Sequence, residues 1–183
     1  MHTHRTFMVV GKTIAALFCA MLLSGCFTDE GDTSLQDLQS PNITVKDAAI
    51  QRVTADGIAE AAPALLTLLD PRYPIKTRKL AIVALGTLAE PRAILPLRTI
   101  IDNNERELTE EAIEALGKIG DPSVRDLLKK LIEDREYAIP AIWAMGKIGG
   151  TEATQVLTEL LNDPDQHVTY NAYHALIAIK DTP

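Results

Sequence analysis

Aromatic side chains and clusters of positive charge are scarce in this chain. Phe, Trp and Tyr make up 4% of its 183 residues, and its formal net charge at pH 7 is −7. A surface that binds nucleic acid needs clustered Lys and Arg for the phosphates and aromatic rings on which unpaired bases stack. The composition therefore argues against a nucleic-acid partner.

The apolar run near the N-terminus is too short to span a membrane. It extends from Thr13 to Leu23, eleven residues without a charge, whereas a transmembrane helix needs about 20 apolar residues. Arg5 and Lys12 precede the run and small residues follow it, which is the pattern of a secretory signal peptide. Residues 1–25 are therefore predicted to be a signal peptide that is removed.

Cysteine is also rare, and one of the two cysteines closes this segment. Cys19 lies within the apolar run, and Cys26 directly follows Ser24 and Gly25. The motif LSGC at 23–26 resembles the lipobox of bacterial lipoproteins. The resemblance implies that the chain is cut before Cys26, that the thiol of Cys26 carries a diacylglycerol, and that the new amino terminus is acylated. The alternative is an ordinary signal peptide, with Cys26 left as a free thiol.

The lipoprotein resemblance implies a location in a bacterial cell envelope. Removal of residues 1–25 leaves 16 basic against 25 acidic side chains, and an acidic chain is repelled by anionic headgroups, so the expected membrane anchor is the lipid. The protein would then lie on the periplasmic face of the envelope or on the outer face of the cytoplasmic membrane. Phe27 and Thr28 lack the aspartate associated with inner-membrane retention, which favours the outer membrane.

A flexible tether is predicted directly after the lipidated cysteine. Residues 26–41 include the acidic stretch FTDEGDTSLQDLQSP, and a coil of this length has a root-mean-square reach of roughly 20 to 25 Å. The sequence thus predicts three parts, namely a signal peptide at 1–25, a lipidated cysteine with its tether at 26–41, and a folded domain at 42–183.

One motif recurs through residues 42–183. AIVALGTLAEP begins at Ala81, AIEALGKIGDP at Ala112 and AIWAMGKIGGT at Ala141, with weaker copies at Ala49 and Ala172. Apolar residues recur at helical spacing twice in each unit of about 31 residues, and helix pairs that cannot bury their apolar faces alone must stack. We therefore predict an all-α fold, a right-handed α-solenoid of about four and a half helix pairs.

The predicted helix ends carry capping residues. A capping-box-like Thr44-x-x-Asp47 opens the first helix, and Asp121-Pro122 supplies an N-cap followed by proline. Glycines stand where a helix C-cap favours a left-handed residue, namely Gly57, Gly120 and Gly149.

These units resemble the short HEAT-like repeats of the phycobilisome lyase type, whose pattern ends in Ala-Leu-Gly-x-Ile-Gly-Asp-Pro, as residues 115–122 do. We predict a non-enzymatic scaffold that holds another envelope protein, whereas the resemblance by itself implies the alternative, an accessory protein that handles a chromophore or cofactor. The export signal and the lack of a mature thiol favour the scaffold. The arginine column of the family reads Lys46, Arg78, Thr109, Ala138 and Thr169, so only the first two units keep a base.

The predicted partner site lies on the second helix of each pair, the side that HEAT-type solenoids present as concave. An apolar strip with a polar rim is typical of a protein-binding groove. The strip consists of Ala62, Pro63, Leu66, Ile94 and Leu95, with Arg98 and Lys129 as its basic edge. A partner would present an apolar segment flanked by acids. Alternatively, the tether folds back through Leu35 and Leu38 and covers the strip.

No catalytic, metal or cofactor site is predicted. The sequence lacks a P-loop, a nucleophile elbow and a His-Glu-x-x-His motif. His167 and His174 are both on the last helix, and seven residues place them about 10 Å apart along its axis, too far to share one ion.

Two further features leave alternatives open. Trp143 is predicted to be partly exposed, either in an aromatic contact patch with Tyr137, Tyr170 and Tyr173 or as the cover of the last helix interface. The basic loop at 71–79 either binds an acidic partner or balances neighbouring acids.

Overall fold

The computed structural model describes residues 30–180. Contacts divide the chain into two units, residues 1–33 and 34–183, and the second contains nearly all of the described residues. Cys26 and the predicted signal peptide lie outside the described part. Between residues 30 and 180 the secondary structure is helical, without a strand, and no helix there is both long and apolar enough to cross a membrane.

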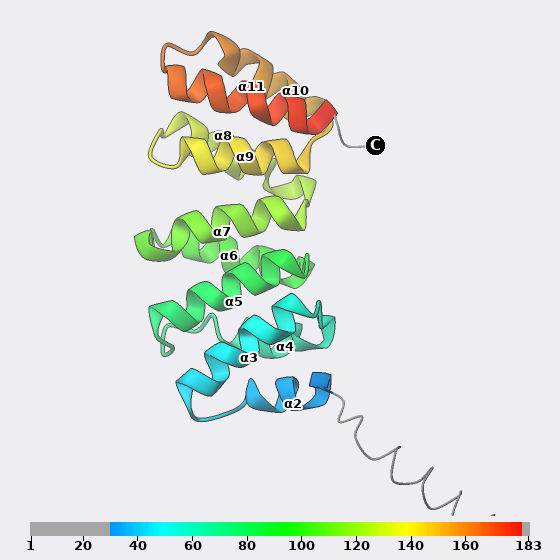
Figure 1. Cartoon of the computed structure of the whole chain (residues 1–183). Coiled ribbons are helices and arrows are strands. Elements are labelled where there is room, and N and C mark those ends of the chain that lie inside the picture. Colours follow the sequence, from blue (N-terminus) through cyan, green and yellow to red (C-terminus); the bar gives the residue numbers. More distant parts are fainter. Residues whose placement is uncertain (1–29, 181–183) are drawn as a thin grey trace, which may run out of the picture. The chain divides into compact units, whose positions relative to one another are not determined.

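The helices of the second unit form two rows. In Figure 1 the first helices of the pairs lie in front of the second helices. The first-helix row consists of α3 (Ile43–Ala55), α5 (Ile75–Thr87), α7 (Arg106–Ile119), α9 (Ala138–Ile148) and α11 (Gln166–Lys180). The second-helix row consists of α4 (Ala62–Thr67), α6 (Ile94–Asp102), α8 (Arg125–Glu133) and α10 (Gly150–Glu159). The predicted all-α solenoid is therefore confirmed, with α11 as the half pair at its end.

Short 3-10 helices connect the two rows. They occupy Ala59–Ala61, Pro91–Ala93, Pro122–Val124 and Leu160–Asn162. Gly120 ends α7 with a φ of 77°, a left-handed conformation that glycine adopts without a Cβ clash. Asp121 then accepts a hydrogen bond of 2.8 Å from the backbone N–H of Ser123. The predicted cap at Gly120-Asp121 is thus confirmed, and Gly57 and Gly149 also have positive φ.

The start of α3 differs from the prediction. Asn42, not Thr44, is the N-cap, and its side-chain oxygen accepts a hydrogen bond from the Thr44 backbone N–H at 2.9 Å. Asp47 is buried and accepts a hydrogen bond of 2.7 Å from the hydroxyl of Thr77 on the next first helix. Asp47 therefore joins two repeats rather than closing a capping box.

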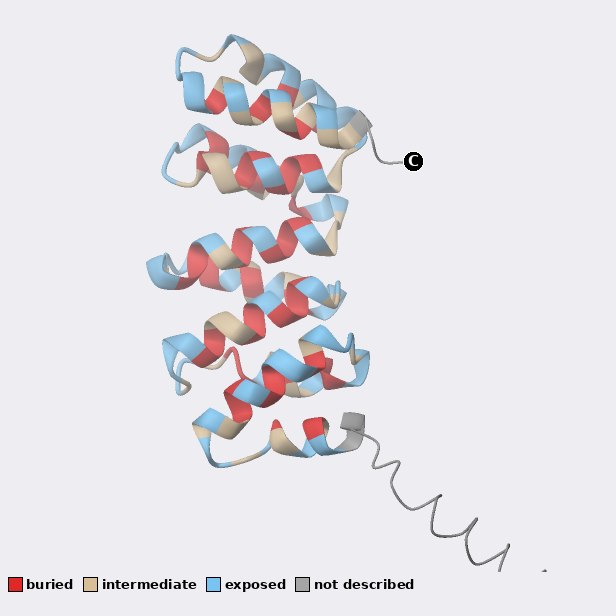
Figure 2. Cartoon of the chain, in the orientation of Figure 1, coloured by how far each residue is buried: buried red, intermediate tan, exposed pale blue. Residues whose placement is uncertain are grey.

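Small residues bring successive first helices close together. Gly86, Gly117 and Gly146 each face an alanine of the next first helix. A Cβ added at Gly117 would lie 2.7 Å from the Cα of Ala144, whereas carbon atoms in contact lie about 3.5–4.0 Å apart. Figure 2 shows buried residues beside exposed ones along each first helix, as expected for helices that pack on one side.

Polar side chains also join the repeats. The Arg78 side chain, 4% exposed, forms an ion pair with Glu105 at 2.7 Å and donates a hydrogen bond to the Leu69 carbonyl at 2.9 Å. The same column is buried at Lys46, Thr109 and Ala138. Arg78 therefore links the end of one repeat to the start of the next, and an apolar or hydroxyl side chain takes the equivalent position later in the stack.

The segment predicted to be a flexible tether is folded over its second half. Helix α2 spans Glu30–Asp37, and Ser34 and Leu38 are buried. Asp37 forms an ion pair with Arg52 of α3. Leu35 and Leu38 lie three residues apart on one helical face and pack into the apolar core. Residues 34–41 therefore belong to the folded unit, and the prediction of a tether extending to residue 41 is wrong for them.

Candidate functional site

The predicted second-helix strip is not a continuous open surface. Ala62 is 1% exposed and belongs to the core, so its assignment to the strip is wrong. Leu66 and Ile94 are half-buried and pack against the same core. Leu95 is the open member, 74% exposed on α6. The predicted strip is interrupted at Ala62, because the side chain of Ala62, at the start of the short α4, faces the core.

Pro63 lies beside the N-terminal segment rather than in an open groove. With Leu35, Leu38 and Tyr73 it lines a cavity of about 660 Å³. The Lys46 ammonium at this cavity lies 5.0 Å from the centre of the Tyr73 ring, a cation–π distance. Residues 35–38 thus fold back beside Pro63 as in the alternative prediction, but they do not cover it, because Pro63 is exposed.

The predicted basic edge is present but borders little apolar surface. Arg98 is half-buried on α6 and Lys129 is exposed on α8. Neither side chain forms a hydrogen bond or an ion pair with another residue in the 30–180 range. Of the predicted apolar strip, only Leu95 is widely exposed near these two bases. The second-helix row therefore does not form the expected apolar strip with a charged rim.

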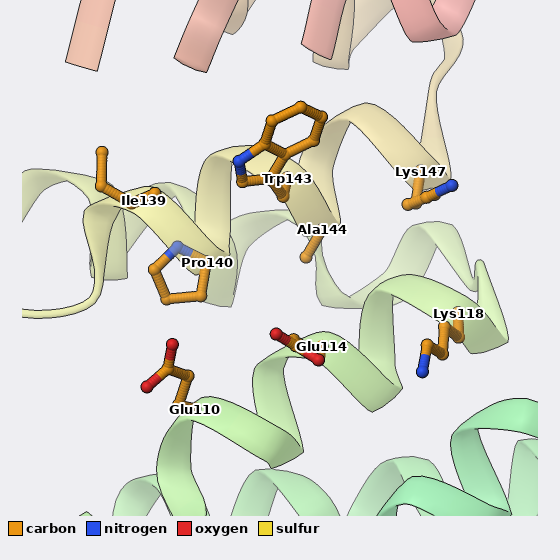
Figure 3. A pocket seen from close by; sticks show the side chains of 8 residues that line it. All are labelled: Glu110, Glu114, Lys118, Ile139, Pro140, Trp143, Ala144 and Lys147. Carbon is orange, nitrogen blue, oxygen red and sulfur yellow. The ribbon is translucent and has the colours of Figure 1, made fainter. Parts of the chain in front are cut away.

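A more complete groove lies on the opposite row, between α7 and α9 (Figure 3). Its volume is about 240 Å³. The apolar lining comes from α9, with Ile139, Pro140, Trp143 and Ala144. Charged side chains form the rest of the lining, Glu110, Glu114 and Lys118 from α7 and Lys147 from α9. We call this site the α7–α9 groove.

The helical period explains this arrangement. Residues 110, 114 and 118 lie four apart on α7, and 140, 143, 144 and 147 lie three or four apart on α9, so each set occupies one helix face. The close approach of Gly117 to Ala144 forms the floor between the two faces. The contact between Gly117 and Ala144 thus sets the spacing of α7 and α9 at the groove.

Trp143 is held in place at the edge of the groove. It is 39% exposed, which confirms the predicted partial exposure. Its indole Nε1–H donates a hydrogen bond of 2.8 Å to Oδ1 of Asn171 on α11, and the Asn171 amide donates to the His167 carbonyl at 2.7 Å. The polar atom of the indole is thus satisfied by α11, while much of the ring stays open.

Other aromatic residues extend this region along α11. The Tyr170 and His174 rings lie 4.3 Å apart between centroids, and the Tyr173 and His174 rings 5.5 Å apart. Tyr170 and Tyr173 are exposed. Tyr137, in contrast, packs against the core and lines a different cavity near Leu131. An exposed aromatic patch therefore exists on the first-helix row, without Tyr137.

The charges of the groove differ from those of the basic loop at 71–79. All four bases of that loop pair with acids: Arg72 with Asp70, Lys76 with Asp47, Arg78 with Glu105 and Lys79 with Glu111. The hydrogen bond that the Lys79 ammonium donates to the Glu111 carboxylate raises the pKa of Lys79. The loop thus balances neighbouring acids, the second of its two predicted roles.

The groove acids and lysines, in contrast, are available. The side chains of Glu114, Lys118 and Lys147 have no hydrogen-bond or ion-pair partner in the part of the chain that the structure describes. Glu110 acts on Lys79 only by longer-range attraction, since the ion pair of that lysine is with Glu111. The groove was not predicted from the sequence, because the expected site lay on the second helices.

The described residues offer no site for a metal ion. Among residues 30–180 there is no group of three or more His, Cys, Asp or Glu side chains that could hold one. His167 is exposed at the start of α11, and His174 is stacked with the two tyrosines. His167 and His174 therefore have different surroundings and do not form one site.

Comparison with solved structures shows the same fold. One match is a chain from the complex of CpcE and CpcF of phycocyanin lyase from Nostoc sp. PCC7120, with 20% identity and a TM-score of 0.65. It covers 81% of this chain but 64% of that one, so this protein spans less than two thirds of its length. An engineered protein matches with 21% identity and a TM-score of 0.57, over 82% of this chain and 79% of that one. A designed armadillo repeat protein in complex with the peptide (KR)4 matches with 23% identity and a TM-score of 0.54, over 80% of both chains.

Sequence comparison assigns the family. No curated protein matches the chain significantly. The family described as HEAT repeats matches residues 62–140 and 133–183, which together are more than half of the sequence. The chain therefore belongs to the HEAT-repeat family.

Proposed function

We propose that this protein is a non-enzymatic HEAT-repeat scaffold, anchored to a membrane of the bacterial cell envelope, that binds another envelope protein. The observation that carries the proposal is the α7–α9 groove, which joins an apolar lining and a half-exposed tryptophan to rim charges without partners. Buried aromatic anchors surrounded by a polar rim are characteristic of protein interfaces.

Related folds support a binding role. The phycocyanin lyase structure is a complex of CpcE and CpcF, and the designed armadillo protein was solved with a bound peptide. A stack of helix pairs exposes a long ridged surface, because each repeat contacts only its neighbours. This shape suits a protein whose task is to hold a partner.

A photo-crosslinking residue tests the binding surface in cells. We expect a crosslinker at Glu114, in the α7–α9 groove, to capture a specific partner that mass spectrometry identifies. A crosslinker at Leu95 reports on the second-helix row, and one at Ser123, an exposed turn residue, measures background. Equal products from all three positions, or none above background from Glu114, would contradict the proposed binding site.

The membrane anchor rests on the lipobox resemblance at 23–26, and on Cys26 in particular. Two or three acyl chains, at roughly 0.8 kcal/mol per buried methylene, hold a protein on a membrane, where one chain does so only marginally. We expect a fatty-acid probe to label the wild type and not Cys26→Ala, which should accumulate as precursor or in the soluble fraction. Equal labelling of both proteins would exclude lipidation at Cys26. Membrane fractionation then separates the outer membrane, which we favour, from the cytoplasmic membrane.

The absence of catalysis is part of the proposal. Most charged side chains that lie near one another are engaged in ion pairs between repeats, as for Arg78 with Glu105 and Arg135 with Asp163. Screens for hydrolase and transferase activity test this statement. A reproducible activity that disappears when one side chain is changed would show that the protein is an enzyme.

Chromophore or cofactor handling is the alternative function, since the phycocyanin lyase complex has the same fold. Fold alone does not determine function. Incubation of the purified protein with a bilin or with haem, followed by absorbance spectroscopy, separates the two functions. A bound pigment with a shifted spectrum would favour the alternative over the scaffold.

A further inference from the structure

The α7–α9 groove carries opposite charges at its two ends. In Figure 3, Glu110 lies opposite Pro140 at one end, and Glu114 lies near the centre. Lys118 and Lys147 lie together at the other end. A surface with this arrangement attracts a ligand whose own charges are separated in the same way. The two lysines oppose a purely basic ligand, and the two carboxylates oppose a purely acidic one.

Trp143 also lines the groove, and in Figure 3 its ring points away from the α7 carboxylates. Since the Trp143 Nε1–H is occupied by Asn171 on α11, the ring orientation is defined before any ligand binds. The exposed part of the ring offers a partner an apolar contact at the edge of the groove. A preorganised ring also lowers the entropy cost of binding.

The spacing of the charges defines the length of the ligand. Eight residues separate Glu110 from Lys118, which corresponds to about 12 Å along α7. An extended peptide rises about 3.3 Å per residue, so its two charged side chains lie three to four residues apart. A free amino acid has its two charges too close together to span this distance.

Building on the proposed binding function, we infer that the α7–α9 groove takes a short extended segment of a partner protein. The segment presents a basic side chain to Glu110 and Glu114. Three or four residues further on it presents an acidic side chain to Lys118 and Lys147. Apolar residues between the two charges lie against Pro140 and Ala144. The partner class is thus defined by charge order and spacing rather than by a single net charge.

Three blocked peptides test the inference on the full-length chain purified in detergent. The dipolar peptide is Gly-Arg-Leu-Ala-Asp-Gly, and Gly-Arg-Leu-Ala-Arg-Gly and Gly-Asp-Leu-Ala-Asp-Gly are its all-basic and all-acidic counterparts. Binding is followed by the fluorescence of Trp143, the one tryptophan of the chain, and by NMR shifts of α7 and α9. We expect the dipolar peptide to bind about three- to tenfold more tightly than either counterpart, the range for a pair or two of exposed charges.

A change of preference gives the decisive readout. Lys118→Glu combined with Lys147→Glu makes the groove acidic throughout, and both lysines are exposed, so folding is retained. The variant should prefer the all-basic peptide, a gain that unfolding cannot produce. The matched control is Lys129→Glu with Lys130→Glu on α8, where both lysines are also exposed. It alters the net charge equally and should keep the wild-type preference.

The outcomes separate this inference from the proposed function. Equal binding of the three peptides, no binding of any of them, or an unchanged preference in the Lys118→Glu, Lys147→Glu variant would overturn the inference. Loss of specific crosslinking from Glu114 in cells would overturn the proposed binding site as well. A partner captured at Glu114 whose crosslinking is insensitive to the double lysine variant would overturn the charge pattern alone.

Discussion

Replacement of Gly117 by alanine tests how the first helices are stacked. The added Cβ would lie 2.7 Å from the Cα of Ala144 and 2.9 Å from its Cβ. Because carbon atoms in contact need about 3.5–4.0 Å, α7 and α9 must separate by roughly 1 Å or tilt apart. The same movement would widen the α7–α9 groove, since Gly117 and Ala144 form its floor.

The sign of the effect distinguishes this contact from an ordinary helix position. In an exposed helix interior, alanine is more favourable than glycine by about 1 kcal/mol. Overpacking a well-packed interface costs typically about 1–3 kcal/mol, and occasionally more. We therefore expect Gly117→Ala to lower the free energy of unfolding by about 1–2 kcal/mol, where an open site would show an increase.

Urea unfolding measures this change, with circular dichroism for the whole stack and Trp143 fluorescence for α9. Lys118→Ala, an exposed neighbour, should change the free energy by less than about 0.5 kcal/mol. Gly120→Ala has no atom within 4 Å of the added Cβ but a φ of 77°. It should cost about 1–2 kcal/mol through backbone strain without altering the fluorescence of the folded protein. If Gly117→Ala is as stable as the wild type or more stable, the close approach of α7 and α9 is wrong.

Three further predictions follow from burial and charge. Leu95→Asp should shift the free energy of unfolding by less than about 0.5 kcal/mol, whereas Leu66→Asp should lower it by about 2 kcal/mol or more, because Leu66 packs against the core. Equal melting temperatures of the two variants would contradict this difference in burial. Hydrogen bonds from the Arg92 side chain and backbone lower the pKa of Glu90 from 4.5 to about 2, so the stabilisation by ionised Glu90 is complete above about pH 4.5 and is lost as the pH falls toward 2. The difference in unfolding free energy between the wild type and Glu90→Gln, measured by urea titration, should therefore disappear over this pH range. A difference that does not depend on pH would refute the pairing. Arg78→Met should lower the free energy of unfolding by about 3 kcal/mol, because the Leu69 carbonyl and Glu105 lose a buried partner. Arg135→Met should lower it by less than about 1 kcal/mol, because the Arg135 guanidinium is half-exposed. Similar denaturation midpoints for the two variants would argue against this reasoning.

Much of the fold could be predicted because its determinants are local. The apolar residues of AIEALGKIGDP repeat at helical spacing, so the helix can be read from one unit. Gly120 marks the end of α7, because the chain turns there and needs a residue in the left-handed conformation. Thr44 was predicted to cap α3, but Asn42 lies two residues earlier and an Asx side chain competes well for the same N–H groups.

The candidate site could be predicted only in part. The partial exposure of Trp143 could be predicted from the sequence. The sequence did not indicate that Pro140 and Ala144 on one helix and Lys118 on another would line one cavity. That depends on the approach of α7 to α9, which Gly117 permits.

The sequence by itself determined the number and order of the helix pairs, the cap at Gly120-Asp121 and the HEAT-repeat family, because each depends on contacts within one helix or one unit of about 31 residues. The tertiary structure decided which surfaces stay open. Ala62 turns inward and Leu38 inserts into the core, while an apolar groove opens on the first-helix row. The physical reason is that burial depends on the distance and angle between successive helices, and the position of a residue on its own helix specifies neither.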